Sequence, residues 1–135
     1  MNVLIALSDD KHDFHQRAVA WFSRDPQRAW ATCPITENGF VRIIGHRKYP
    51  GFSGGTTAAR GMLEALCILP GHQFWPDDLS VRDRVNFKLL PDSRHLTDHY
   101  LLGLAAHRKG RLVTLHQGVD VSGIVGGDHA LFLIP

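Results

Sequence analysis

Residues 94–115, RHLTDHYLLGLAAHRKGRLVTL, decide the fold because they read as a helix followed by a buried strand. Thr97 is a good N-cap, and Asp98 lies in the first turn, where a carboxylate complements the helix dipole. Gly110 is expected to end the helix. The apolar run 111–115 then predicts a strand covered on both faces, as in α/β proteins. One helix face is marked by residues at helical spacing, namely Leu101, Leu104, Ala105 and Arg108.

A second acid occupies the same kind of position earlier in the chain. Residues 29–33 predict a short strand, and Pro34 opens a helix in which Thr36 is expected to cap and Glu37 lies in the first turn. Taken alone, each acid does no more than favour a helix start. Because each helix adjoins a strand, however, Glu37 and Asp98 are predicted to converge at one end of a sheet.

The remaining elements alternate along the chain. Helices are predicted over 13–24, 56–69 and 79–90, the last with Asp78 as its N-cap, and strands over 2–7, 72–75 and 130–134. We therefore expect one domain over residues 1–135, with a three-layer α/β/α fold and a mainly parallel sheet.

Composition narrows the function classes. A formal charge of +2 over 135 residues does not mark an obligate nucleic-acid binder. Cys33 and Cys67 lack CxxC spacing, so reduced thiols in a cytoplasmic protein are expected, and no signal peptide or membrane span is visible. His12 and His15 have no zinc-motif partners, and surface histidines are the commoner explanation.

The stretch 45–55, GHRKYPGFSGG, is predicted to be a loop. Arg47 and Lys48 stand beside Tyr49 and Phe52, a combination able to contact RNA backbone and bases, although such loops are more often only solvated.

Several motifs together carry a family resemblance. NVLIAL at 2–7, WATCPITENGFVRI at 30–43, PGHQFWPDD at 70–78, LTDHYLLGLA at 96–105 and GRLVTL at 110–115 follow in the order seen in VapC-type PIN-domain ribonucleases, which the chain resembles over nearly its whole length. The resemblance implies an endoribonuclease toxin that uses Mg²⁺ or Mn²⁺ held by carboxylates. It also implies that residues 2–7 form a helix, against their strand propensity.

The resemblance assigns roles residue by residue. Glu37 and Asp98 match two of the family's metal-binding acids, with Thr36 and Asn2 in supporting positions and Arg47 and Lys48 as RNA contacts. The family's first acid precedes a dipeptide like Met1-Asn2, so we expect the given chain to lack that acid and its strand, most simply through a start codon assigned too late. His116 stands where the family usually has Asp; it is a possible Mn²⁺ ligand, whereas Asp120 is more simply a solvated side chain.

Two hypotheses follow. One is a metal-dependent ribonuclease toxin, and the other is a catalytically degenerate PIN module that binds a partner without cutting RNA. The resemblance implies a cognate antitoxin, an RNA substrate and a second copy of the chain as partners, with no membrane.

Overall fold

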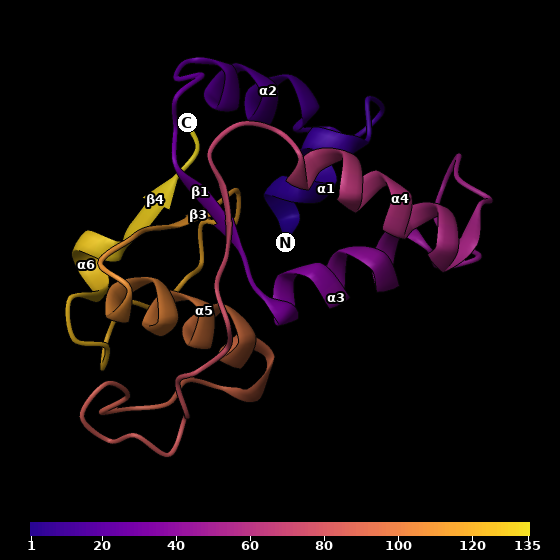
Figure 1. Ribbon diagram of the computed structural model, residues 1–135. Coiled ribbons are helices and arrows are strands. Elements are labelled where there is room, and N and C mark those ends of the chain that lie inside the picture. The colour runs from indigo at the N-terminus through magenta and orange to yellow at the C-terminus, as the bar shows by residue number, and fades with distance from the viewer. The chain divides into compact units, whose positions relative to one another are not determined.

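The computed structural model describes residues 1–135, and these form two compact units, Met1–Asp77 and Asp78–Pro135. Helices are interspersed with short strands, and both strand pairs are parallel, which confirms the predicted mixed α/β class and the mainly parallel pairing. Figure 1 traces the chain through these helices and strands. The strands belong to two separate two-stranded sheets. None of the helices combines the length and apolar character needed to cross a lipid bilayer. Each unit is described in turn.

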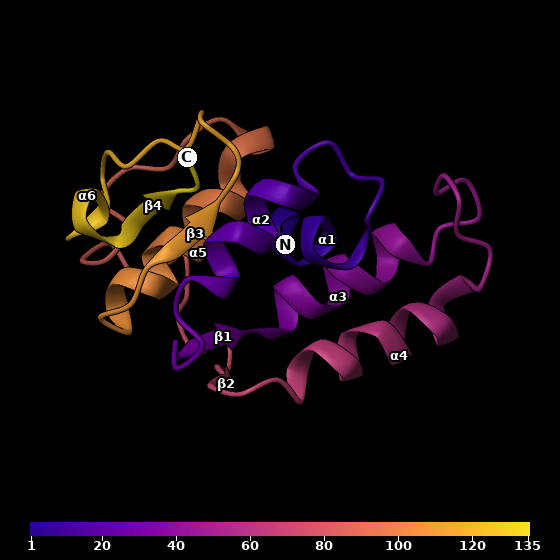
Figure 2. The same ribbon diagram turned by 90° about the horizontal axis from the view of Figure 1, so that it is seen from above.

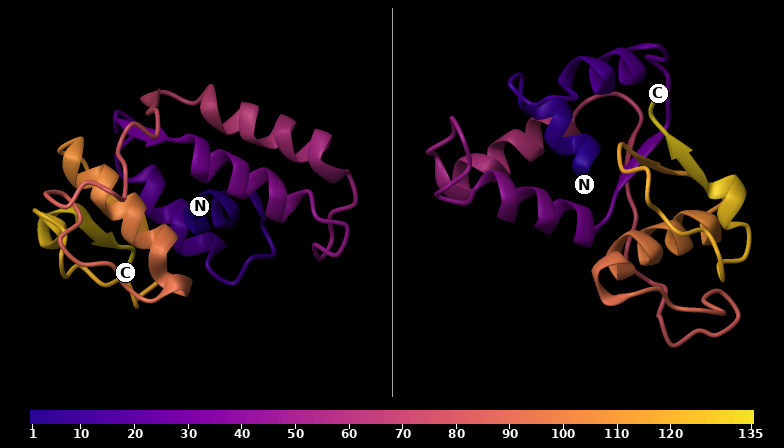
Figure 3. Two further views of the ribbon diagram at one scale, coloured as in Figure 1. Left: turned by 90° about the horizontal axis from the view of Figure 1, so that it is seen from below. Right: turned by 180° about the vertical axis from the view of Figure 1, so that it is seen from behind.

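The first unit is mainly helical. β1 and β2 pair in parallel, with Thr32 opposite Phe74. Helices α3 and α4 run side by side, as Figures 2 and 3 show. The elements are α1 (Asn2–Ser8), α2 (His15–Ser23), β1 (Trp30–Thr32), α3 (Pro34–Ile44), α4 (Gly55–Cys67) and β2 (His72–Phe74).

The first segment is a helix, as the resemblance implied, and the strand predicted for it from propensity is wrong. Val3, Leu4, Ile5 and Ala6 are all buried, although they are consecutive. A short run that is apolar throughout fits a helix covered on all sides as well as a buried strand, and periodicity does not separate the two.

The core of the first unit lies between α1, α3 and α4. Phe40 is fully buried, and a Cβ atom on Gly39 would lie 2.3 Å from the sulfur of Met1. The missing side chain at Gly39 therefore allows the start of the chain to lie against α3. The buried core residues are Leu4, Ile5, Phe40, Ile44, Ala59 and Leu63.

In the second unit, one central helix is covered by strands and loops. Residues 99–105 of α5 are all buried, so this helix is buried on all sides rather than along one face. The Phe87 ring packs over Gly103, where a Cβ atom would lie 2.4 Å from it. The elements are η1 (Ser93–His95), α5 (Leu96–His107), β3 (Leu112–Thr114), α6 (Gly127–Ala130) and β4 (Leu131–Leu133), with β3 and β4 parallel.

The helix predicted over 79–90 is wrong, because this segment is irregular. The carboxylate of Asp83 accepts hydrogen bonds from the backbone N–H groups of Val85 and Asn86, at 2.9 and 3.2 Å, which closes a turn. Phe87 then forms an isolated antiparallel bridge with Ile124. Asp78 is not an N-cap either, since it accepts from Arg108 at 2.8 Å.

The predicted helix ends also need correction. Cys33, not Thr36, is the N-cap of α3, and Thr36 lies at the third helical position. Thr97 does not cap α5, because the 3₁₀ turn η1 feeds directly into it. At the other end, Lys109 takes the left-handed conformation, with φ of 56°, and the Gly110 N–H donates to the Ala105 carbonyl at 2.8 Å.

Candidate functional site

Glu37 is held by a buried hydroxyl in the first unit. The Thr32 hydroxyl donates to Oε1 of Glu37 at 2.6 Å, and the Thr32 hydroxyl oxygen also lies 2.8 Å from Nε2 of His72. Thr32 is 2% exposed, whereas Glu37 is half-buried. Because the single hydroxyl proton goes to the carboxylate, Nε2 of His72 is the donor to the Thr32 oxygen. The carboxylate is therefore fixed on one side and accessible on the other.

The chain around Glu37 explains why it takes this position. The Cys33 backbone N–H donates to the Thr36 hydroxyl, and that hydroxyl donates to the Cys33 carbonyl, both at 2.9 Å. The Ile35 N–H donates to Asp77 Oδ2 at 3.1 Å. These bonds use the free backbone groups at the start of α3 and fix the turn that carries Glu37. Thr36 therefore stabilises the turn that carries Glu37, and the supporting role at a metal site predicted for it stays a prediction.

Two further side chains lie beside Glu37, and sequence reasoning missed both. Donor atoms of Glu37, Cys67 and His72 all lie within 4.8 Å of one another. Cys67 is the last residue of α4 and His72 the first of β2, so a Cys-x₄-His spacing across one turn was the signal available. Burial raises the pKa of the Cys67 thiol, and the negative charge of Glu37 raises it further.

Asp98 and His116 meet in the second unit. Nδ1 of His116 lies 3.2 Å from Oδ2 of Asp98, and the two side chains are 46% and 38% exposed. The His95 ring stacks on His116, with ring centroids 6.3 Å apart. The Thr114 hydroxyl accepts the backbone N–H of His116 at 3.0 Å. Asp98 thus lies in the first helical turn with an imidazole, not a second carboxylate, beside it.

The carboxylate of Asp120 is hydrogen-bonded within its own loop. Its carboxylate accepts from the Ser122 N–H at 2.9 Å, and hydrogen bonding by Ser122 lowers the pKa of Asp120. Its backbone carbonyl lies 3.3 Å from Nδ1 of buried His99, whose Nε2 lies 3.0 Å from the Leu89 carbonyl. The interpretation of Asp120 as a loop residue rather than a ligand agrees with this geometry.

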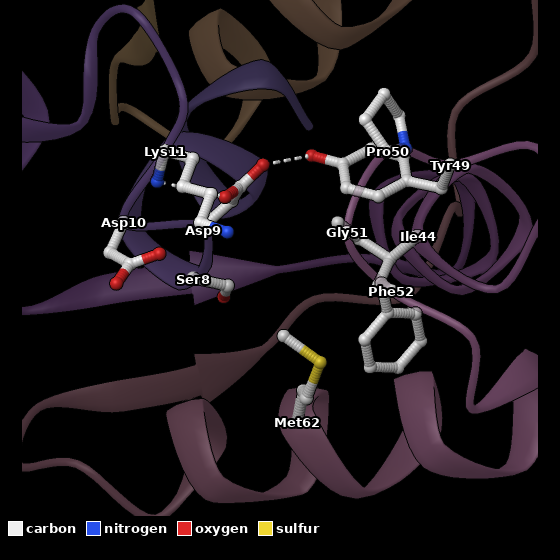
Figure 4. Close-up of a pocket in the computed structure, with 10 residues that line it drawn as sticks. All are labelled: Ser8, Asp9, Asp10, Lys11, Ile44, Tyr49, Pro50, Gly51, Phe52 and Met62. Carbon is white, nitrogen blue, oxygen red and sulfur yellow. Dashed lines mark hydrogen bonds between the residues drawn. The ribbon is translucent and has the colours of Figure 1, made fainter.

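The predicted loop over 45–55 is confirmed up to Gly54, and Arg47 and Lys48 are exposed on it. The aromatic side chains beside them are engaged elsewhere. Tyr49 donates to Oδ2 of Asp9 at 2.6 Å across a cavity of about 240 Å³, as Figure 4 shows, and Phe52 packs against the core. This bond lowers the pKa of Asp9, while burial and Asp9 raise the pKa of Tyr49 to about 12.

The remaining sequence expectations concern thiols, histidines and the N-terminus. Both cysteines are free, Cys33 buried and Cys67 half-buried. His15 Nδ1 lies 2.7 Å from the Ala6 carbonyl, which is a structural contact rather than metal ligation. Asn2 opens α1, in the segment that Gly39 allows to lie against α3.

The donor set fits hard divalent ions at both acids. Glu37 and Asp98 each offer a partly accessible carboxylate in the first turn of a helix, and carboxylate oxygens are the ligands that Mg²⁺ and Mn²⁺ prefer. Neighbouring imidazole and thiol groups suit Mg²⁺ poorly, so the carboxylates are the groups that would hold it.

Relatives with curated names cover most of the sequence. The chain is 42% identical to Ribonuclease VapC38 of Mycobacterium tuberculosis over 119 residues, which is 88% of this chain and 84% of the relative. It is 40% identical to Ribonuclease VapC39 and 37% identical to Ribonuclease VapC44 of the same organism, over 93% of this chain and 92% and 89% of those proteins. No protein-family model matches the sequence. The extent and level of identity show that the chain belongs to the VapC family of PIN-domain ribonuclease toxins.

Proposed function

We propose that this protein is a metal-dependent endoribonuclease, the toxin of a toxin–antitoxin pair, in which Glu37 and Asp98 are ligands of Mg²⁺ or Mn²⁺. The observation that carries the proposal is the carboxylate of Glu37, held by buried Thr32 at 2.6 Å in a chain whose relatives are named ribonucleases. A bound divalent ion supplies a water of lowered pKa and stabilises charge on the phosphate.

The residues of the chain have separate parts in this reaction. Glu37 and Asp98 bring negative charge and hard oxygen ligands, and Thr32 fixes the direction of the first carboxylate. His116 contacts Asp98 and offers a ring nitrogen that suits Mn²⁺ better than Mg²⁺. Arg47 and Lys48, exposed on the 45–54 loop, attract the RNA backbone. Thr36 supports the turn that carries Glu37, and Asn2 opens the helix whose start lies against α3 at Gly39.

The partners belong to the same proposal. We expect a cognate antitoxin that silences the toxin by bringing a Lys or Arg to the carboxylates, since a charge-assisted bond there competes with the metal ion. We also expect a homodimer. Light scattering of the purified chain, alone and with its antitoxin, measures both assemblies directly.

The test is cleavage of RNA with and without divalent ions. A form carrying Leu-Leu-Asp before Met1 is assayed beside the given chain, because the family resemblance places an acid there. Cleavage is expected with Mn²⁺ or Mg²⁺, to be abolished by a chelator, and to fall at least about 1,000-fold in Glu37→Ala and Asp98→Ala. Glu64→Ala is the matched control, because Glu64 is an exposed glutamate on α4.

The result that overturns the proposal is equal cleavage in Glu37→Ala and Glu64→Ala, or cleavage that survives the chelator. If the extended form is folded but cuts RNA only after His116→Asp, the partner-binding alternative describes the natural protein instead.

A further inference from the structure

We propose that Glu37, Cys67 and His72 form a binding site for a transition-metal ion of the zinc class, and that this ion silences RNA cleavage by occupying Glu37. The binding site stands on geometry alone. The silencing rests on the proposed function, in which Glu37 holds the catalytic ion.

Three different elements bring the donors together. Glu37 lies in the first turn of α3, Cys67 ends α4, and His72 opens β2, which pairs with β1. Their ligand atoms lie within 4.8 Å of one another, and each residue is half-buried. Donor atoms around a tetrahedral zinc ion are about 3.4–3.8 Å apart. Side-chain rotations that move the donor atoms by roughly 1 Å are therefore enough to close the site around an ion.

The chemistry of the donors selects the ion. A thiolate, an imidazole and a carboxylate match the ligand types of zinc sites, whereas Mg²⁺ and Mn²⁺ favour oxygen. Three protein ligands leave the fourth position for water. Cys67 also lies at the C-terminal end of α4, where the helix dipole favours a cation.

Thr32 keeps this donor set assembled without an ion. Its hydroxyl is bonded to Glu37 at 2.6 Å and to His72 at 2.8 Å, so two of the three ligands are already joined through one buried atom. Preorganised ligands lose less side-chain entropy when the ion binds. On binding, the Cys67 thiol releases its proton to solvent. The proton on Nε2 of His72 moves to Nδ1 or leaves the ring, and the bond from Nε2 to Thr32 is exchanged for a bond to the ion.

Competition follows from the shared carboxylate. Glu37 is the only acid of the three ligands, and a carboxylate fixed on zinc beside a thiolate no longer offers the same oxygen geometry to Mn²⁺. Affinities of divalent ions at nitrogen and sulfur ligands rise strongly from Mn²⁺ to Zn²⁺, so Zn²⁺ at low concentration displaces Mn²⁺ from Glu37.

The test titrates the metal-free, reduced chain with Co²⁺, which reports thiolate ligation by a charge-transfer band and is displaced by Zn²⁺. We expect one Co²⁺ per chain, with the band lost in Cys67→Ser and the Zn²⁺ affinity lowered at least about 100-fold in Cys67→Ser and His72→Gln. Cys33→Ser is the matched thiol control, since Ser preserves the helix cap, and His129→Gln, an exposed histidine, is the matched imidazole control. Both controls should bind like the natural chain, and melting curves confirm that each variant is folded.

In the cleavage assay with Mn²⁺, Zn²⁺ should inhibit the natural chain at least tenfold near one equivalent. Cys67→Ser should cut RNA at the natural rate and need about 100-fold more Zn²⁺ for the same inhibition. The site is overturned if the natural chain gives no thiolate band, or if the band persists in Cys67→Ser. Silencing is overturned if Zn²⁺ inhibits Cys67→Ser and the natural chain alike, and a chain that binds Co²⁺ but cuts no RNA contradicts the proposed function rather than the site.

Discussion

The regions around Glu37 and Asp98 share a plan but differ in how firmly they hold the acid. In each, a buried threonine ends a strand, Thr32 in β1 and Thr114 in β3, and an acid lies in the first turn of a helix. Thr32 donates to the carboxylate of Glu37 itself, at 2.6 Å. Thr114 accepts a backbone N–H, and the partner of Asp98 is an exposed imidazole at 3.2 Å.

The difference teaches that the same sequence signature produces two kinds of site. Glu37 is oriented by a donor that is 2% exposed and lies beside a thiol and an imidazole. Asp98 faces His116, whose side chain is 46% exposed. The carboxylate of Glu37 is therefore held by a buried hydroxyl group, whereas the partner of Asp98 is an exposed side chain.

Among the variants that compare the two regions, the largest expected effect comes from changing the length of each acidic side chain by one methylene group. Glu37→Asp withdraws the acid from Thr32, and cleavage should fall about 100-fold, because a misplacement of roughly 1 Å costs that much at a fixed site. Asp98→Glu, at the looser site, should lose less than about tenfold. Initial rates with Mn²⁺ measure both. Equal losses in the two variants contradict the distinction between a fixed and a loose acid.

The two threonines provide the next comparison. Thr32→Val removes the donor to Glu37, and metal affinity should fall roughly 10-fold, with a loss of about 1–3 kcal/mol in the free energy of unfolding. Thr114→Val removes the acceptor for the partly buried backbone N–H of His116, which water can replace, so less than about 1 kcal/mol and little activity should be lost. Calorimetric metal titration and urea unfolding measure these effects. A metal affinity left unchanged by Thr32→Val shows that Thr32 does not position Glu37.

His116 decides how far the second region resembles the first. His116→Asp adds a hard oxygen ligand beside Asp98, so the rate of cleavage with Mg²⁺ should rise roughly three- to tenfold. The ratio of the rate with Mn²⁺ to the rate with Mg²⁺ should therefore fall. His116→Asn, which is uncharged, is the control and should not produce the gain. Rates measured over a series of Mg²⁺ and Mn²⁺ concentrations check the expectation, and an unchanged ratio of the two rates argues against His116 as a metal neighbour.

The smallest expected effect concerns Asp9. Its carboxylate also accepts a hydrogen bond from a hydroxyl group, but it lies outside the regions around Glu37 and Asp98. Tyr49→Phe removes the bond to Asp9 and should lower the free energy of unfolding by about 1 kcal/mol at neutral pH without changing cleavage. Urea unfolding and the Mn²⁺ cleavage assay measure this, with Asp10→Asn as an exposed control. Loss of cleavage in Tyr49→Phe contradicts the placement of Asp9 outside the site.

The same bond gives the Tyr49→Phe comparison a defined pH dependence. The fold lowers the pKa of Asp9, so its contribution is present above about pH 4 and is lost as the pH falls through the lowered value. The fold raises the pKa of Tyr49 to about 12, so its contribution is present below about pH 10 and is lost as the pH rises through that value. The difference in the free energy of unfolding between the natural chain and Tyr49→Phe should therefore be constant from about pH 5 to 9 and should shrink below and above this range.

Local sequence signals were sufficient for the elements that carry the two acids. Pro34 and the apolar residues after it fix α3, and Asp98 lies in the first turn of α5 as expected. The local sequence signals failed over 79–90, where the side chain of Asp83 closes a turn and Phe87 pairs with Ile124. A helical spacing of apolar residues does not reveal a distant backbone partner. The local signals failed also at residues 2–7, where the run is apolar on every side.

The sequence by itself determined the class of fold, the family and the placement of Glu37 and Asp98 in first helical turns, because propensities and family motifs act over a few residues. Only the tertiary structure decided what surrounds those acids. Cys67 and His72 reach Glu37 because α4 packs against α3 and β2 pairs with β1, and the Thr32 hydroxyl bonds to both Glu37 and His72. Such contacts depend on how elements pack, and packing joins residues that are far apart in the sequence.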